Sequence, residues 1–251
     1  MTVSLCDMPF RQLVEHDAKL AELRLEYAKH PPDQRRKAAL FEYDADLATN
    51  LFAEAVLRLP GQKDWPPERN LCQGAVVALA IDPECAPAML TIGSAEYQLG
   101  RVDEAMVHFL ALADLPADTP ELPTITDEAG DFLLDQEDFS RAHSLYAAAT
   151  RAHPTVPLYH AALGYCAGKL GDLEAGVRHA RRAVELAPNS HEHLTDLGWA
   201  LVEIKSYEEA GQVLEKAVAL APSSYELTRN NLQECRRRRE ARDRRSGSQS
   251  Q

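Results

Sequence analysis

The sequence has little of several features that point to particular protein classes. Aromatic residues make up only 6% of it, and the longest apolar run, residues 75–81, is far shorter than the roughly 18 residues of a membrane span. No basic stretch followed by an apolar one opens the chain, so we expect no signal peptide. The cysteines are dispersed, which indicates free thiols in a reducing, cytoplasmic compartment. They are Cys6, Cys72, Cys85, Cys166 and Cys235.

Motifs for catalysis and for metal binding are also missing. There is no glycine-rich phosphate loop, no Gly-x-Ser-x-Gly and no paired acid motif, so we expect no catalytic residues. His191 and His193 are two residues apart and would point to different faces of a helix. Without a Cys-x2-Cys pair either, we expect no metal and no cofactor. Cys166 lies in a helical pattern with no base indicated beside it, so we expect it in the core.

The charge is unevenly distributed. The whole chain carries a formal charge of −12, yet residues 236–245 hold seven arginines against two acids. An acidic body disfavours nucleic acid as the main ligand, because phosphates would be repelled. The arginine run could contact RNA, anionic lipid, an acidic partner or the acidic body of another copy. A solvated helix end is the more usual explanation, and it is the one we expect.

What the chain does contain is a repeated unit. Glycines at positions 130, 164 and 198 are evenly spaced, with an interval of 34, and a fourth, at 93, precedes them by 37. Small or apolar residues follow each glycine at +12, +16 and +19, and a proline follows at +24 in the last three copies. Self-similarity at this period is typical of stacked supersecondary units. The wider first interval falls in a proline-rich loop at 115–123.

Elementary physics explains these residue types. Glycine inside a helix costs about 1 kcal/mol relative to alanine, so its recurrence indicates close approach of two helices. Prolines at 154, 188 and 222 would end the second helix of each unit, because proline lacks the backbone donor. Short turns are expected at Gly100-Arg101, Gly171-Asp172 and Lys205-Ser206. Each unit is therefore predicted to be a pair of helices joined by a tight turn.

The pattern resembles the tetratricopeptide repeat family, which has the same period. The resemblance covers roughly residues 83–222 and implies an all-α, right-handed α-solenoid of helix-turn-helix repeats, with N-terminal helices and a C-terminal capping helix. It departs from the family where an aromatic often stands four residues before the glycine. Met89, Thr126, His160 and Leu194 occupy those positions.

The predicted organisation follows from the resemblance and the chain breaks. We expect an N-terminal helix at 1–32, a divergent first helical pair at 33–85 and four repeats over 86–222. The capping helix, with its basic end, is expected at 223–245, and a disordered tail at 246–251. The four repeats are expected at 86–122, 123–156, 157–190 and 191–222.

In the resembled family the first helices line a concave groove that holds a partner peptide or helix. Carried over by offset from each glycine, the expected peptide-binding residues are Leu90, Ser94, Tyr97, Gln98, Asp127, Asp131, Asp135, Tyr165, Lys169, Thr195 and Trp199. The three aspartates recur every four residues and share one helix face. Beside aromatic anchors, they would suit a partner with basic and apolar residues.

Each of these features has an ordinary structural alternative. The aspartates could form a solvated face, Tyr165 and Trp199 could pack between repeats, and Lys169 could simply form an ion pair. The sequence favours a non-catalytic scaffold for protein partners. A dedicated chaperone for one client protein, or a self-assembling structural scaffold, stays open as an alternative.

Overall fold

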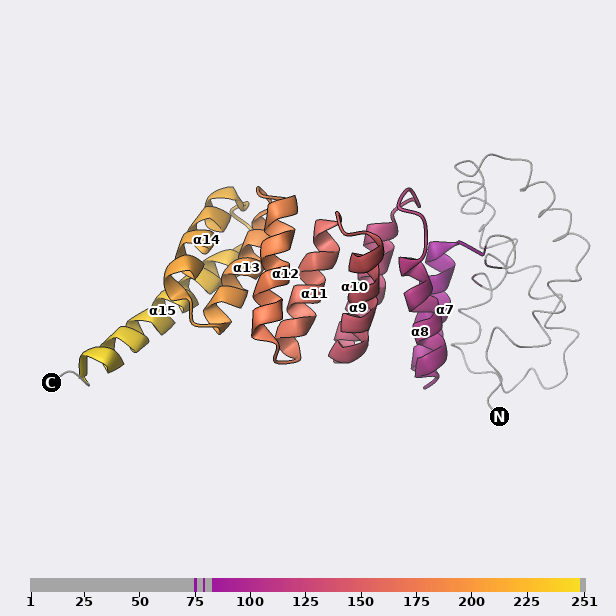
Figure 1. Cartoon of the computed structure of the whole chain (residues 1–251), viewed down its shortest axis with the longest axis horizontal. Helices are drawn as coiled ribbons and strands as arrows, with labels where there is room; N and C mark the ends of the chain where they lie inside the picture. Colours follow the sequence, from indigo (N-terminus) through magenta and orange to yellow (C-terminus); the bar gives the residue numbers. More distant parts are fainter. Residues whose placement is uncertain (1–74, 76–78, 80–82, 249–251) are drawn as a thin grey trace, which may run out of the picture. The chain divides into compact units, whose positions relative to one another are not determined.

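The computed structural model describes residues 83–248, together with Ala75 and Leu79, and every regular element within them is an α-helix (Figure 1). The helix expected at 1–32 and most of the helical pair expected at 33–85 lie outside the described residues. The chain divides into two compact units, residues 1–132 and 133–251, with the boundary inside one helix.

The described helices follow one another in chain order, and a single long helix ends the series. They are α7 (Ala86–Gln98), α8 (Val102–Ala113), α9 (Leu122–Asp135), α10 (Phe139–Ala152), α11 (Pro157–Lys169), α12 (Leu173–Leu186), α13 (His191–Glu203) and α14 (Tyr207–Leu220). Contacts join α7 to α8, α11 to α12 and α13 to α14 as pairs. The last helix is α15 (Glu226–Ser248), which continues beyond the boundary expected at 245. The expected all-α fold of helix-turn-helix repeats is confirmed for the described residues.

The helix ends follow the sequence signals. The helices α10, α12 and α14 each end two residues before a proline, at Ala152, Leu186 and Leu220. The side chains of Asp138 and Asp172 accept hydrogen bonds from backbone amides in the first turns of α10 and α12. The widened loop expected after the first repeat lies between Ala113 and Leu122.

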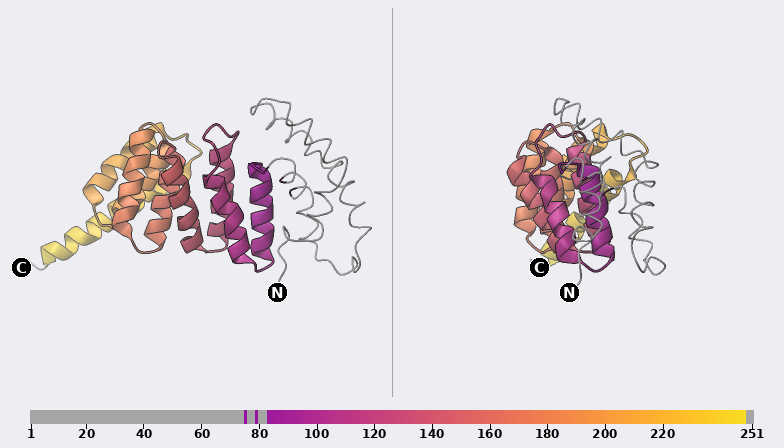
Figure 2. Two further views of the ribbon diagram at one scale, coloured as in Figure 1. Left: turned by 45° about the vertical axis from the view of Figure 1, so that its right-hand side comes forward. Right: turned by 90° about the vertical axis from the view of Figure 1, so that its right-hand side faces the viewer.

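A glycine contact holds α11 against α12, two helices that lie side by side in Figure 1 and in the left view of Figure 2. A Cβ atom at Gly164 would lie 2.9 Å from the carbonyl oxygen of Gly176 and 3.2 Å from the backbone nitrogen of Ala180. Backbone atoms cannot move aside as a side chain can. The expectation that the recurring glycine permits close helix approach is therefore confirmed at this repeat.

The positions four residues before each glycine are buried although none of them holds Phe, Tyr or Trp. Met89 and His160 are 7% exposed, Leu194 is 2% exposed and Thr126 is fully buried. His160 also forms a hydrogen bond of 3.0 Å between Nε2 and the carbonyl oxygen of Pro154. These side chains fill the place in which the family often has a larger one.

The turn inside each pair has one left-handed residue, seven positions after the glycine. Gly100 and Gly171 adopt φ values of 77° and 91°, whereas Glu137 and Lys205 adopt φ values of 56° and 64°. A residue with a Cβ atom is strained there, because Cβ approaches the following carbonyl oxygen. Two of the four turns therefore contain a residue that the backbone does not favour.

We predict that Gly164→Ala lowers the free energy of unfolding by about 1–3 kcal/mol, because the added methyl group meets backbone atoms. Gly168→Ala on the same helix is the matched control. No atom lies within 4 Å of a Cβ at that position, so helix propensity should raise stability by up to about 1 kcal/mol. Urea unfolding monitored by circular dichroism measures both changes, and an equal response of the two variants would contradict the close contact.

A second prediction concerns the strained turn. Lys205→Gly should raise the free energy of unfolding by about 0.5–1 kcal/mol, since glycine adopts positive φ without the steric penalty. Lys205→Ala keeps the strain and removes only the long side chain, so its stability should match that of the wild type. Thermal unfolding of the three proteins checks this, and stabilisation by alanine as well as glycine would assign the effect to the lysine side chain.

Candidate functional site

The first-helix position of α11 presents an exposed aromatic side chain. Tyr165 is 50% exposed, and the ammonium nitrogen of Lys169 lies 5.2 Å from the centre of its ring. The same nitrogen lies 5.5 Å from the ring centre of Phe139. Ala161, one turn before Tyr165, is small and buried. The α11 face therefore offers an accessible aromatic ring with a cation at one side.

The equivalent face of α13 is covered. Thr195 is 1% exposed, and its hydroxyl donates to the carbonyl oxygen of His191 at 2.6 Å. The Thr195 and Thr228 hydroxyl oxygens lie 2.7 Å apart. Trp199 is only partly buried, and the guanidinium carbon of Arg238 lies 5.2 Å from the centre of its ring. Both covering residues come from α15, so an expected groove surface is occupied by the chain itself.

The N-terminal half of α15 is part of the hydrophobic core. Leu232 is 8% exposed and Cys235 is 1% exposed, and both pack in one cluster with Leu201 and Leu214 of the preceding pair. The thiol of Cys235 donates to the carbonyl oxygen of Tyr207, with a separation of 3.4 Å. This half of the helix covers the apolar faces that α13 and α14 would otherwise expose, as a capping helix does.

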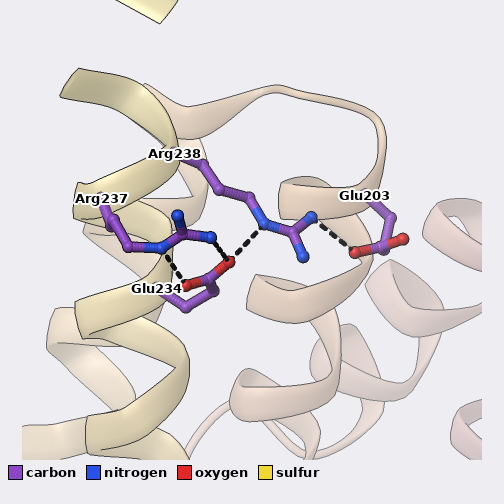
Figure 3. Close-up of polar contacts among 4 residues, drawn as sticks. All are labelled: Glu203, Glu234, Arg237 and Arg238. Atoms are coloured by element: carbon purple, nitrogen blue, oxygen red, sulfur yellow. Dashed lines mark hydrogen bonds and ion pairs between the residues drawn. The ribbon is translucent and has the colours of Figure 1, made fainter. Parts of the chain in front are cut away.

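The C-terminal half of α15 is held by charge. Arg238 donates from Nη1 to Glu203 at 2.9 Å and from Nε to Glu234 at 2.7 Å (Figure 3). Its guanidinium group therefore lies over the ring of Trp199 and pairs with an acid of α13 at the same time. These hydrogen bonds raise the pKa of Arg238 above its ordinary value, the bond to Glu234 contributing most.

Two further arginines reach α14. The guanidinium carbon of Arg242 lies 5.4 Å from the ring centre of Tyr207, and the group pairs with Glu208. Hydrogen bonds from Arg242 lower the pKa of the Glu208 carboxyl to about 2. Arg236 pairs with Glu215 at 2.9 Å. The helix end that we expect to be solvated is partly exposed, and Arg236, Arg238 and Arg242 also pair with the acidic body of their own chain.

In the first unit the expected groove residues of α7 are mostly half-buried. Leu90, Ser94 and Tyr97 are partly covered, and Gln98 is exposed. The ring of Tyr97 meets the ring of Phe132 edge-on, with centroids 5.4 Å apart and planes at 89°. Packing within the first unit therefore uses one face of Tyr97.

The three expected aspartates all lie on α9. Asp127 is partly buried, whereas Asp131 and Asp135 are exposed. Their spacing of four residues puts them on one side of this helix, as the sequence predicts. Their binding of a partner stays a prediction.

The cysteines that the structure describes, Cys85, Cys166 and Cys235, are free and buried. Cys166 is fully buried, and burial raises the pKa of its thiol to about 12, so it carries no nucleophilic thiolate near neutral pH. His160 and His179 stack with ring centroids 5.9 Å apart. Burial, and then the neighbouring His160, lower the pKa of His179. Within residues 83–248, no three His, Cys, Asp or Glu side chains are placed to hold a metal ion.

Two arrangements were not predicted from the sequence. Glu96 is fully buried and pairs with Arg101 at 3.2 Å, inside the first unit. The contact of Arg238 with Trp199 and Glu203 is the other. The sequence feature that could have indicated this contact is the spacing of Arg238 and Arg242, which are four residues apart and so share one helix face.

Solved structures of other helical repeat proteins resemble this chain. The structure of MamA residues 41-end from Desulfovibrio magneticus RS-1 is 19% identical, with a TM-score of 0.46, and the match covers 72% of this chain and 97% of that one. YrrB, described as a TPR protein with an unusual peptide-binding site, is 17% identical, with a TM-score of 0.46, and the match covers 75% of this chain and 92% of that one.

A curated relative matches a shorter stretch. Protein SGT1 homolog of Oryza sativa subsp. japonica is 30% identical over 99 residues, which are 39% of this chain and 27% of that protein.

In the part of the chain that the structure describes, no helix has the length and apolar character needed to cross a membrane.

The family model described as tetratricopeptide repeat matches residues 128–191 and again residues 162–225. The two matches overlap and span the helices from α9 to α14, in which the recurring glycines are evenly spaced. Repeats of this type are interaction scaffolds that present extended binding surfaces. Residues 128–225 of this chain therefore belong to the tetratricopeptide repeat family.

Proposed function

We propose that this protein is a non-catalytic scaffold that binds a partner polypeptide on the first-helix face of its second unit. The exposed ring of Tyr165 is the observation that carries the proposal, because an aromatic side chain of this size is half exposed at an expected groove position. Aromatic residues are enriched among the side chains that dominate binding energy. Ala161 and the half-buried Gly168, both on α11, have no long side chain beside Tyr165. An extended chain can therefore approach the helix there.

The proposed partner has both basic and apolar residues. Arg238 supports this chemistry, because its guanidinium group lies over the ring of Trp199 and pairs with Glu203 on this side of the repeats. Tyr165 stands one repeat earlier at the position equivalent to Trp199. As a separate proposal, Asp127, Asp131 and Asp135, which share one face of α9, attract basic residues of a partner in their own right. The cytoplasmic location expected from the cysteines stays a prediction.

The experiment is affinity capture with the immobilised full chain, followed by mass spectrometry of the bound proteins. We expect Tyr165→Ala to reduce captured partner about tenfold, the loss of roughly 1.4 kcal/mol or more that truncation of an aromatic anchor causes. Leu227→Ala is the matched control, since Leu227 is also 50% exposed but lies on α15. Equal loss in both variants, or no loss in Tyr165→Ala, would contradict the proposed anchor.

The acidic contribution is tested separately in the same assay. Replacing Asp127, Asp131 and Asp135 together by asparagine should weaken capture most at low salt, because exposed charges are screened as ionic strength rises.

The identity of the captured proteins separates the alternative functions. Capture of a single stoichiometric client would favour the dedicated chaperone, whereas capture of several partners would favour the general scaffold. Light scattering that gives a strict monomer at high concentration would argue against a self-assembling scaffold.

A further inference from the structure

The two halves of α15 are held by different forces. Up to Cys235 the helix contributes buried side chains, among them Thr228 and Leu232, to the core of the second unit. From Arg236 to Arg245 its one apolar residue is Ala241, which is exposed. The contacts of this second half with α13 and α14 are ion pairs and cation–π contacts. We call residues 236–248 the arginine segment.

The contacts of the arginine segment define a surface on α13 and α14. It consists of two aromatic rings, each with a carboxylate beside it. One arginine side chain contacts each ring and its neighbouring carboxylate. We call it the arginine surface; its residues are Trp199, Glu203, Tyr207 and Glu208. The two arginines that it receives, Arg238 and Arg242, are one helical turn apart, which matches the spacing of an arginine-bearing helix.

The chemistry of the surface favours arginine over lysine. A guanidinium group is planar, so it can stack on an aromatic ring and donate in its own plane to a carboxylate. Arg238 contacts both groups, with its central carbon 5.2 Å from the Trp199 ring centre and Nη1 2.9 Å from Glu203. An ammonium group is a compact point charge and cannot make the two contacts with the same geometry.

No buried apolar side chain fastens residues 236–246, so the arginine segment can leave while the rest of α15 stays in place. The side chains of Arg238 and Arg242 are 34% and 41% exposed, and that of Glu208 is 62% exposed. Ion pairs with this much exposure contribute little and are screened by salt. Cys235, one residue before the segment, is buried and anchors the helix at that point.

We propose that the arginine segment is an internal occupant of the arginine surface, and that an arginine-bearing partner segment binds there only when it withdraws. The proposal rests on the proposed function in one respect: the arginine surface includes Trp199, which belongs to the same first-helix face as Tyr165. It adds the side-chain chemistry of the partner and the element that controls access. Occupation in cis lowers the apparent affinity by the fraction of molecules in which the surface is open.

The test uses a labelled synthetic peptide with the sequence of residues 236–248 and the full-length protein, with binding followed by fluorescence anisotropy at low ionic strength. Arg238→Ala combined with Arg242→Ala vacates the surface. We expect this variant to bind the peptide about tenfold or more tightly than the wild type, because cation–π and ionic competition in cis is removed. A peptide with lysine in place of Arg238 and Arg242 should bind the vacated variant with little increase in affinity over the wild type.

A matched control has the same change in charge. Arg237 and Arg244 pair with Glu234 and Glu240 of α15 itself, so Arg237→Ala combined with Arg244→Ala leaves the surface occupied. This control should bind the peptide as the wild type does. Adding Trp199→Ala to the vacated variant should abolish the gain. Equal binding by the wild type, control and vacated variants would overturn the proposal, as would binding by none of them.

A second measurement reports on the surface without any peptide. In a Trp65→Phe background Trp199 is the single tryptophan, and its accessibility follows from quenching by acrylamide. Vacating the surface should increase quenching relative to the Arg237 and Arg244 control, with the circular dichroism spectrum unchanged. Unchanged quenching would overturn occupation in cis. Neither measurement uses Tyr165 or its captured partner, so failure of the proposed function and failure of this inference are distinguishable.

Discussion

The approach of two helix backbones at Gly164 is the constraint on which the second unit depends. The nearest foreign atoms to a Cβ at that position would be backbone atoms of α12, at 2.9 and 3.2 Å. On the facing side of α12, the small residues Gly176, Ala180 and Ala183 have no long side chain that would hold the helices apart. All three are buried. Tyr165 directly follows Gly164, so it lies about 100° around the helix from the contact with α12, and it is half exposed.

The repeat register also explains why the stack ends where it does. Leu232 stands one full repeat interval after Gly198, at the place where another repeat would have its glycine. A leucine there leaves no room for a second helix to approach, and α15 runs on as one helix through the position of the next turn. In Figure 1 its C-terminal end extends past α13 and α14 of the same unit. The segment beyond the turn position is the one that carries the arginines.

The sequence was sufficient for the elements whose causes are local. Glycine, alanine and proline spacing predicted the described helix pairs and their turns, because each signal acts within a few residues of the structure it specifies. Local signals fail at Glu137 and Lys205, because glutamate and lysine do not favour positive φ. Only their position in the repeat, seven residues after the glycine, indicates a left-handed turn there. The coverage of Trp199 was not predictable, because Arg238 lies more than a whole repeat further along the chain and the contact depends on how α15 docks. Predictions for residues 1–74 remain predictions.

The central claim is that α15 has an apolar half fixed in the core and a charged half held on the surface by Arg238 and Arg242. Hydrogen–deuterium exchange of the full chain at low salt and at about 1 M salt, where the screening length falls to roughly 3 Å, tests it most directly. The account predicts that amides of 238–246 lose protection at high salt while those of 229–235 keep it. Equal protection of both halves at both salt concentrations, or loss of both together, would contradict it.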